Sequence, residues 1–336
     1  MTGGASRAGC EPVRWGFLGA GWIAARALAP AVHAADGAAL VAVAARDTDR
    51  ARRLGPSGRT YDDYAGLLAD PDVEAVYVAL SNEAHLPWTL AALEAGKHVL
   101  CEKPLGLTAE QVRQMAAAAV RADRLLVEAT FSRWHPRTRR AEALLRSGAI
   151  GAVREIDAGF TFPTVPAGNY RWEPDRGGGA LYDVGPYALG AALWASLGSP
   201  PLSAQPDPVQ VLAVTVDRAP TGVDLTCAAA LRVGSAEAEV RVSIAERPAQ
   251  WLRVHGEAGT LVLEEPAFTS WLAPSTLLLD DASGRSALEF GPVDPYQRMV
   301  EHVSRAVRGD GCAWVLPVEE SLRVARAMDL VRAGAP

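Results

Sequence analysis

The sequence predicts an α/β protein with an N-terminal doubly wound parallel sheet and a C-terminal α+β domain that has a large open, mostly antiparallel sheet. Two patterns indicate this fold class. From Val13 to about Val127, short apolar runs alternate with alanine-rich helical segments, as in βαβ units. In the second half of the chain, several runs alternate apolar and polar residues with a period of two, as half-buried strands do.

Five apolar runs of the first domain are predicted strands, and segments between them are predicted helices. The strands are expected over residues 13–20, 39–46, 73–80, 98–104 and 124–131, with helices over 23–35 and 86–96. Because strands alternate with helices, the strands should run parallel in one sheet.

The second domain begins with a change of pattern. A Pro/Gly-rich loop over residues 162–179 precedes an apolar helix, and a hairpin is expected around Gly256 to Gly259. Two amphipathic helices, 295–310 and 318–334, close the chain. The strand over 235–245 should place these side chains inward and outward in turn: Ala238, Val240, Val242 and Ile244 inward, and Glu239, Arg241 and Ser243 outward.

Composition narrows the class of protein. The chain has 336 residues, 49% of them hydrophobic, and a net charge of −6 without a basic run, which argues against a nucleic-acid partner. No run of about 18 apolar residues predicts a membrane span, and the first twelve residues lack the apolar core of a signal peptide. We therefore expect a disordered tail over 1–12 and a cytoplasmic protein. The cysteines form no C-x-x-C pair, so neither a disulfide framework nor a metal site is expected.

A glycine-rich turn follows the first strand. In "GFLGAGWIA", Gly19 and Gly21 would let backbone N–H groups approach a pyrophosphate, and Ala24 would allow close packing of the next helix. This G-x-G-x-x-A pattern between a strand and a helix predicts dinucleotide binding. A plain structural turn and a methyl-donor site are the weaker alternatives.

The end of the second strand should lie beside the adenosine ribose. An acidic residue there suits the 2′-hydroxyl of NAD, whereas an arginine suits the 2′-phosphate of NADP. Arg46 favours NADP(H), while Asp47 keeps NAD(H) open. Either side chain could instead be a solvated loop residue.

Two later strand ends carry polar side chains at the edge where ligands bind in such sheets. Asn82 and His85 follow one strand, although Asn82 could be a helix cap and His85 a structural residue. Lys103 stands between Glu102 and Pro104 at the end of the other strand, and it is one of two lysines in a chain whose other basic residues are arginine. An ammonium responds to its site more than a guanidinium does, which indicates a chemical role for Lys103.

A glycine triplet precedes the last constellation. In "RGGGALYDVGPYALGAAL", Asp183 and Tyr187 are four residues apart and share a helix face. Pro186 should belong to the first turn of that helix, so the start of the helix is left open. The alternative is that Tyr187 belongs to the core and Asp183 caps the helix.

With "GFLGAGWIA", "SNEAH", "EKP" and "GGGALYDVGPY" in this order, the chain resembles the Gfo/Idh/MocA oxidoreductases. Tyr at 187, where many members have His, resembles the branch that holds glucose–fructose oxidoreductase, xylose and dihydrodiol dehydrogenases and deoxysugar 3-ketoreductases. The resemblance implies a Rossmann domain over 13–130, a substrate and oligomerisation domain over 131–315, and a C-terminal helix, 316–336, that packs back on the Rossmann domain. It also implies NAD(P), a catalytic Lys103 and a substrate-facing Asp183.

These expectations give a set of candidate site residues. The catalytic group is Lys103, Tyr187 and Asp183. The cofactor is expected at Gly19, Gly21, Trp22, Ile23, Arg46, Ser81, Asn82, His85, Glu102 and Lys103. The substrate is expected at Arg133, Tyr170, Arg171, Trp172, Asp183 and Tyr187, and Trp134 is a further candidate.

The predicted function is hydride transfer between NADP(H), or NAD(H), and a sugar or cyclitol hydroxyl or ketone. Tyr187 would exchange the proton, and the nearby charge of Lys103 would lower its pKa from a free value near 10. The direction of reaction and the substrate stay open; an arginine-rich, alanine-rich composition makes antibiotic deoxysugar or aminoglycoside biosynthesis one hypothesis. A non-catalytic dinucleotide-binding regulator and a redox-neutral NAD-dependent glycosidase are the alternatives. The open sheet predicts a homo-oligomer.

Overall fold

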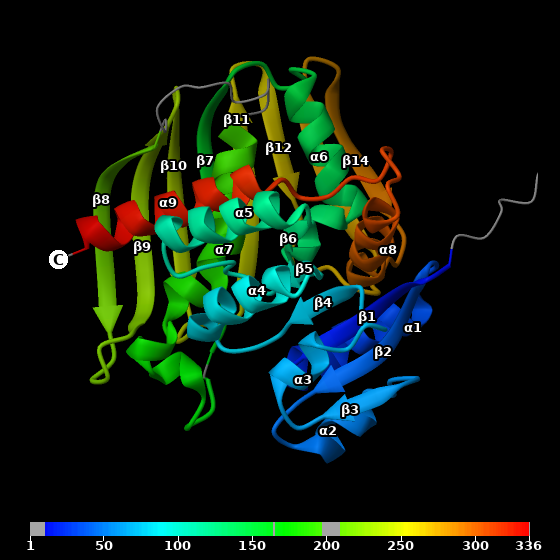
Figure 1. Ribbon diagram of the computed structural model, residues 1–336. Coiled ribbons are helices and arrows are strands. Elements are labelled where there is room, and N and C mark those ends of the chain that lie inside the picture. Colours follow the sequence, from blue (N-terminus) through cyan, green and yellow to red (C-terminus); the bar gives the residue numbers. More distant parts are fainter. Residues whose placement is uncertain (1–10, 164, 197–208, 336) are drawn as a thin grey trace, which may run out of the picture.

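The computed structural model describes residues 11–163, 165–196 and 209–335. Two sheets with their covering helices make up the molecule (Figure 1), and most of the expected tail, residues 1–10, lies outside the described part. The strands of the first sheet are β1 (Val13–Leu18), β2 (Ala38–Ala44), β3 (Arg59–Tyr61), β4 (Ala75–Val78), β5 (His98–Cys101) and β6 (Leu126–Glu128).

The first sheet has the order β3-β2-β1-β4-β5-β6, and every neighbouring pair is parallel. The predicted doubly wound parallel sheet is therefore confirmed. The strand order reverses between β1 and β4, which opens a crevice at their carboxyl ends. Sequence reasoning missed β3, because its three residues are too few to show a period.

Helices cover both faces of this sheet. The alternation of β1 sends Trp15 and Phe17 into one core and Leu18 into the other. The first face lies under η1 (Ala24–Leu28) and α1 (Ala29–Ala34), and the second under α3 (Tyr64–Leu68), α4 (His85–Glu94) and α5 (Ala109–Ala122). The remaining short elements of this region are α2 (Thr48–Arg53), η2 (Asn82–Ala84), η3 (Phe131–Trp134) and α6 (Pro136–Arg146).

The second sheet has eight strands in the order β14-β13-β12-β11-β7-β10-β9-β8, and of these neighbouring pairs β7 and β10 are parallel while the others are antiparallel. The predicted open, mostly antiparallel sheet is confirmed, as is the hairpin that pairs Gly256 with Gly259. The strands are β7 (Val153–Thr161), β8 (Val209–Arg218), β9 (Asp224–Val233), β10 (Ala236–Ser243), β11 (Ala249–Gly256), β12 (Gly259–Leu263), β13 (Ser275–Asp281) and β14 (Gly284–Phe290).

Strand β10 follows the predicted alternation with one exception. Val240 and Val242 are buried and Arg241 is exposed, but Ser243 is fully buried although it was expected outward. Its hydroxyl donates to the carbonyl of Leu225 at 3.1 Å and accepts from the amide of Ala245 at 3.1 Å, which satisfies it inside the protein.

One face of the second sheet is covered by the long apolar helix α7 (Ala180–Ser196), which starts directly after the glycine triplet. Pro186 lies inside this helix and not in its first turn, contrary to expectation. A proline at this place has no N–H for the carbonyl of Tyr182, four residues earlier, so the helix loses one internal hydrogen bond. Burial of nearly every α7 side chain, between the sheet on one side and α9 (Val318–Gly334) on the other, offsets that loss.

The two last helices join the domains. α8 (Pro295–Val307) packs on α1 and β2, where the indole of Trp15 donates to the hydroxyl of Ser304 at 3.1 Å. It therefore covers the first sheet, although we placed it in the 131–315 domain. α9 packs on both α5 and α7, so it contacts the Rossmann domain and the second domain at once.

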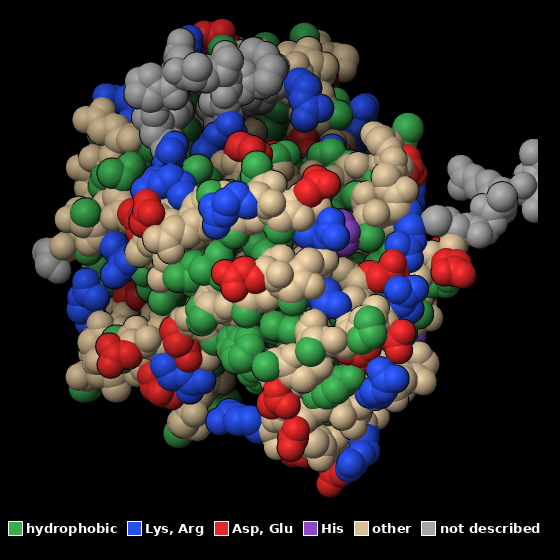
Figure 2. Space-filling view, viewed as in Figure 1, with side chains coloured by type: hydrophobic (Ala, Val, Ile, Leu, Met, Phe, Trp, Pro, Cys, Tyr) green, Lys and Arg blue, Asp and Glu red, His purple; other side chains and the backbone are tan. Residues whose placement is uncertain are grey.

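The described residues contain no helix with the length and apolarity needed to cross a membrane. Figure 2 shows acidic and basic side chains interspersed over the face in view, without a broad field of one sign.

Lys97, the second lysine, has a structural place at the amino end of β5. Its ammonium is buried and donates to the carbonyls of Asp70 at 2.7 Å and Val73 at 2.8 Å, in the turn that precedes β4. A compact ammonium fits between two carbonyls that converge on one point, whereas a planar guanidinium would not.

Replacing Lys97 with Met should therefore lower the free energy of unfolding by about 2 kcal/mol or more, because two buried carbonyls lose their donor while the apolar stem remains. Urea denaturation measures this. Arg121→Met, on the exposed side of α5, is the control and should change stability by less than about 0.5 kcal/mol. Equal stability of the two variants would contradict the structural role of Lys97.

Candidate active site

A cleft of about 1310 Å³ lies where the carboxyl ends of β1, β2, β4 and β5 face the second domain. This is the place at which ligands bind in open α/β sheets. The predicted site residues that line it are Gly19, Gly21, Trp22, Ile23, Arg46, Ser81, Asn82, Glu102, Lys103, Tyr170, Arg171, Asp183 and Tyr187.

The glycine turn after β1 forms one wall of the cleft. Gly19 has φ +100°, and a Cβ there would lie 2.4 Å from the carbonyl oxygen of Ala79, so only glycine fits. A Cβ on Gly21 would lie 4.0 Å from that same oxygen. Protein packing thus requires glycine at 19 but leaves free space at 21, where a ligand could approach the backbone.

The end of β2 and the start of α2 place two cations, Arg46 and Arg50, and the carboxylate residue Asp47 along the cleft. Asp47 is the N-cap of α2, and its Oδ1 accepts from the amides of Asp49 and Arg50, each at 3.0 Å. The guanidinium of Arg50 donates to the carbonyl of Ala20 at 2.7 Å, and exposed Arg46 lines the cleft beside it. Since the carboxylate is engaged by the helix while two guanidinium groups line the space, this end of the cleft suits a phosphate.

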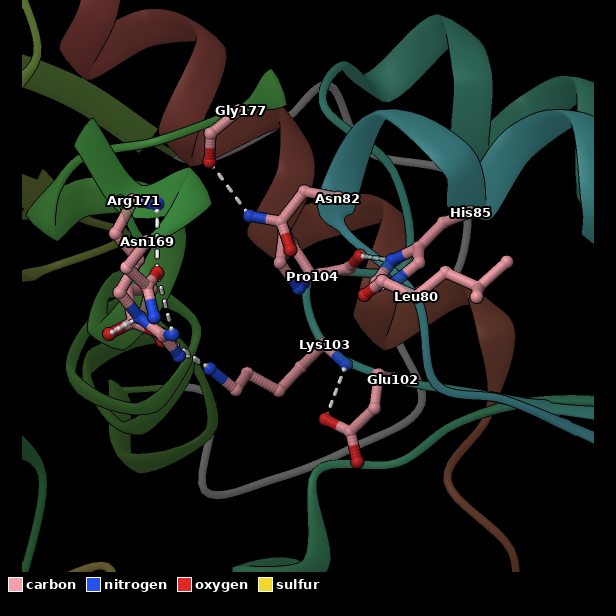
Figure 3. A network of polar contacts seen from close by, with 10 residues as sticks. Leu80, Asn82, His85, Glu102, Lys103, Pro104, Asn169, Arg171 and Gly177 are labelled. Carbon is pink, nitrogen blue, oxygen red and sulfur yellow. Dashed lines mark hydrogen bonds and ion pairs between the residues drawn. The ribbon is translucent and has the colours of Figure 1, made fainter. Parts of the chain in front are cut away.

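Asn82 and His85 fix the strand ends in place. Asn82 Nδ2 donates to the carbonyl of Gly177 at 2.8 Å, which ties the end of β4 to the glycine triplet of the second domain (Figure 3). His85 is fully buried between the carbonyls of Pro104 at 2.8 Å and Leu80 at 3.2 Å. Burial lowers the pKa of His85. The structure therefore places His85 outside the cleft, against the turn that carries Lys103, and not at the predicted cofactor site.

Lys103 extends from the end of β5 toward the second domain (Figure 3). Its Nζ donates to the backbone carbonyl of Asp183 at 2.6 Å and to Oδ1 of the same residue at 3.1 Å. Both contacts lie in the first turn of α7, so one ammonium joins the two domains inside the cleft.

Asp183 receives a second cation. Arg171 Nη2 donates to Asp183 Oδ1 at 2.7 Å, and Arg171 Nε pairs with Oδ2 at 2.7 Å. Burial alone would raise the pKa of Asp183, but Lys103 and Arg171 outweigh it and hold the pKa at about 2. Asp183 is thus a fixed negative charge at neutral pH, suited to holding Lys103 in place and unsuited to exchanging protons.

Tyr187 lies one turn further along α7, with its ring among three phenylalanines. The centroid of the Tyr187 ring lies 6.0 Å from the ring centroid of Phe131, 5.4 Å from that of Phe160 and 6.2 Å from that of Phe268. Lys103 Nζ is 5.6 Å from the centroid of the Tyr187 ring. The structure therefore brings the ammonium and the phenol together in the cleft, as the motifs predicted.

The protonation of Tyr187 differs from the prediction. Burial raises its pKa well above the ordinary value of 10.0, and the neighbouring phenol of Tyr296 and carboxyl group of Glu102 raise it further. The expected lowering by Lys103 is not seen, because the charge of Lys103 is shared with the Asp183 carboxylate in contact with it. Tyr187 is therefore a neutral phenol that can donate a proton.

Glu102 forms the base of the cleft beside Lys103. It is buried, accepts a hydrogen bond from the hydroxyl of Tyr77 at 2.5 Å and another from the amide of Lys103 at 3.2 Å. Burial raises the pKa of Glu102. These contacts fix the backbone from which the Lys103 side chain extends.

Three further candidates lie outside the cleft. Arg133 is buried and forms ion pairs with Glu142 and Glu320, each at 2.6 Å, which leave it no freedom to bind a substrate. The indole of Trp172 donates to backbone carbonyls of its own loop, and Trp134 is buried in the core. Trp172 was predicted as an apolar wall against the substrate and the other two as pocket residues, but none of the three lines the cleft.

Several cleft residues had no local signal in the sequence. They come from the second domain or from single positions in the first: Arg26, Arg50, Phe160, Phe162, Gln250, Thr269, Trp271 and Tyr296. Arg26 and Arg50 come from η1 and α2, whereas the others reach the site through β7, β11, the loop after β12 and α8. Among the described residues, no three His, Cys, Asp or Glu side chains form a cluster that could hold a metal ion.

Both domains match known families. Residues 13–130 match the family described as "Oxidoreductase family, NAD-binding Rossmann fold", and residues 138–262 match the "GFO/IDH/MocA C-terminal domain".

Relatives match this chain over about half to nearly all of its length. The D-xylose 1-dehydrogenase (NADP(+)) 2 of Haloferax volcanii is 36% identical over 94% of this chain and 95% of its own. A dTDP-3,4-didehydro-2,6-dideoxy-alpha-D-glucose 3-reductase of Streptomyces antibioticus is 42% identical over 54% of this chain and 56% of its own. The crystal structure of KijD10, a 3-ketoreductase from Actinomadura kijaniata in complex with NADP and TDP-benzene, matches with a TM-score of 0.85 and 30% identity, covering 97% of this chain and 98% of that one.

The charge balance at Asp183 can be measured directly. Its folded pKa of about 2 lies below the unfolded value near 3.9, so its ionised form stabilises the fold above about pH 4, and this stabilisation is lost as the pH falls toward 2.

Replacing Lys103 with Met should raise the pKa of Asp183, because burial remains while one of its two neighbouring cations is lost. Carbon NMR of the labelled aspartate side chain against pH measures the change, with Lys97→Met as a control that leaves this carboxylate alone. An unaltered Asp183 pKa in Lys103→Met would show that the ion pair is absent in solution.

Proposed function

Because the chain belongs to the GFO/IDH/MocA oxidoreductase family, we propose that it transfers hydride between NADP(H) and a carbon–oxygen bond of a carbohydrate. The observation that supports this proposal most directly is the meeting of Lys103, Asp183 and Tyr187 in one cleft. A dinucleotide-binding regulator would have no use for this group of three.

The chain fits an NADP cofactor. Gly21 has free space where a pyrophosphate would approach, and only glycine can adopt the turn at position 19 that precedes it. Arg46 and Arg50 lie where a 2′-phosphate would be bound, whereas Asp47 is engaged as a helix cap. When bound, the nicotinamide supplies or accepts the hydride.

The protein groups would handle the charge and the proton. Lys103 would donate a hydrogen bond to the substrate oxygen and stabilise the negative charge that develops there. Tyr187 would give that oxygen its proton. Asp183 and Arg171 would keep the ammonium at a fixed point, so little reorganisation is needed during the reaction.

Burial keeps the phenol of Tyr187 protonated in the free protein. A phenol with the ordinary pKa near 10 is also protonated at neutral pH, so both directions of reaction stay open.

The relatives support a carbohydrate substrate. Their names include a xylose dehydrogenase and several 3-reductases of a dTDP-linked deoxysugar. KijD10 has also been crystallised with NADP and TDP-benzene as a lysine-to-alanine variant and as a tyrosine-to-phenylalanine variant. The two substituted positions are separated along that chain by the same number of residues as Lys103 and Tyr187 in this one. We propose a sugar dehydrogenase or 3-ketoreductase, with antibiotic sugar biosynthesis as one setting.

The open face of the second sheet supports an oligomer. On β10 and β11, the side opposite α7 carries Glu239, Arg241 and Arg253 together with half-buried Trp251. We propose that a second copy of the chain covers this face.

The proposed roles predict the effect of two substitutions. Lys103→Met and Tyr187→Phe should each lower kcat by about 10²- to 10⁴-fold while NADPH still binds, because each removes a group that acts on the reacting oxygen. Absorbance near 340 nm measures turnover, and nicotinamide fluorescence measures binding. Redox-neutral hydrolysis would leave the absorbance unchanged.

Tyr182→Phe is the matched control. The Tyr182 hydroxyl lies outside the cleft, where it donates to the carbonyl of Leu107 at 2.9 Å. Near-normal turnover of Tyr187→Phe would contradict the proposal.

Cofactor preference should depend on Arg46. Arg46→Ala should lower kcat/KM for NADPH by about tenfold or more and leave the value for NADH nearly unchanged, because a charge-assisted contact to the 2′-phosphate is lost. The control is Arg52→Ala, which removes a guanidinium that pairs with Asp49 on the exposed side of α2. An equal loss with both cofactors would exclude Arg46 from phosphate recognition.

A further inference from the structure

The wall of the cleft opposite the cofactor domain contains a polar pair beside Tyr187. Gln250 on β11 is the register partner of Phe160 on β7, so both side chains point to the same face of the sheet. The ring of Phe160 lies 5.4 Å from the ring of Tyr187. Phe160 therefore lies between Gln250 and the phenol that is proposed to donate the proton. Both Gln250 and Thr269 line the cleft.

The orientation of the Gln250 amide is fixed by the loop that follows β12. Its Oε1 accepts from the backbone amides of Phe268 and Thr269, each at 3.0 Å. Its Nε2 donates to the hydroxyl oxygen of Thr269 at 2.7 Å. The amide oxygen thus faces the backbone of the loop and the amide nitrogen faces the Thr269 hydroxyl. Only this placement of oxygen and nitrogen satisfies all three contacts.

This arrangement leaves two hydrogens for a ligand. Nε2 of Gln250 has a second hydrogen, and the Thr269 hydroxyl, which accepts from Gln250, still has its own hydrogen to donate. Within the described ranges, neither hydrogen has a protein partner. Two donors side by side in a cleft are suited to one oxygen acceptor.

The loop that carries Thr269 is held rigidly by a buried guanidinium. Arg137 is 1% exposed and donates to the carbonyls of Glu264 at 2.8 Å, Pro266 at 2.7 Å and Ala267 at 2.9 Å. It also donates to the hydroxyl of Ser270 at 2.9 Å. Thr269 therefore lies between Ala267 and Ser270, which Arg137 holds in place. The Thr269 hydroxyl and the Gln250 amide are thus preorganised before a substrate arrives.

We propose that Gln250 and Thr269 bind a second oxygen of the substrate, on a carbon near the reacting carbon–oxygen bond. The inference rests on the proposed function and makes it more specific. Phe160 and Trp271 can pack against a sugar ring, but aromatic rings cannot distinguish a hydroxyl from a hydrogen at one carbon. Gln250 and Thr269 can distinguish them, because a substrate that lacks the oxygen leaves both donors unpaired when it fills the cleft.

The substrate class that follows is a sugar that keeps a hydroxyl beside the reacting carbon. The names of the relatives include both kinds of substrate, xylose and a 2,6-dideoxy sugar. The Gln250–Thr269 pair favours the fully hydroxylated kind for this chain.

The test compares matched sugars on matched variants. D-glucose and 2-deoxy-D-glucose, each free and TDP-linked, and free D-xylose are assayed with NADP by the absorbance near 340 nm. The wild type should prefer the hydroxylated member of each pair. Thr269→Val should lower kcat/KM for the hydroxylated sugar by about tenfold or more and leave the deoxy sugar nearly unchanged. Thr269→Ser, which keeps the hydroxyl, should retain the preference.

The outcomes separate the two proposals. Turnover with an unchanged preference in Thr269→Val would overturn the role of the pair and leave the oxidoreductase intact. No turnover of any sugar by the wild type would overturn the proposed function and the inference with it. Thermal melting checks the fold, and Thr269→Val should melt like the wild type because Oε1 of Gln250 keeps both backbone contacts.

Discussion

The carboxylate of Asp183 is the charge around which the cleft is built. It lies in the first turn of α7 and receives Lys103 from the Rossmann domain and Arg171 from the loop before the glycine triplet. The charges of Lys103 and Arg171 together outweigh that of the Asp183 carboxylate, which suits an oxygen that becomes negative during hydride transfer. The same contacts join the end of β5 to α7, eighty residues later, and to the loop before α7, so the site and the domain interface depend on one ion cluster.

The two lysines show why this chain departs from arginine where it does. Each ammonium donates to backbone carbonyls. Lys97 donates to the carbonyls of Asp70 and Val73, and Lys103 donates to the carbonyl of Asp183. A small, three-donor cation can contact several oxygens that meet at a point, while the planar guanidinium of arginine needs them side by side. Lys97 does this in the interior. Lys103 does it at the edge of the cleft, where it can also reach a substrate.

The sequence predicted those parts of the fold and the site that a few neighbouring residues encode. The turn at Gly19, the strand end at Lys103 and the helical pair Asp183 and Tyr187 are each encoded by a few neighbouring residues, and the structure brings all of them to the cleft. The strand alternation and the order of helices were sufficient for the class of both sheets, although not for the short strand β3.

The rest required three-dimensional information. Gln250 and Thr269 reach the site only through the pairing of β11 with β7 and through a loop held by Arg137, and no short pattern encodes either. His85 and Arg133 were placed in the site because they follow motifs, but sequence spacing does not tell on which side of a turn a side chain emerges. The pKa of Tyr187 was also beyond the sequence, because it depends on burial among phenylalanine rings and on nearby negative charges.

The central claim is that the ammonium of Lys103 and the phenol of Tyr187 act on the same substrate oxygen. A crystal structure of the protein with NADP and a slowly reacting sugar would test it most directly. The account predicts one sugar oxygen within about 2.6–3.2 Å of both Lys103 Nζ and Tyr187 Oη. A sugar bound in the cleft with no oxygen within reach of both groups would contradict it.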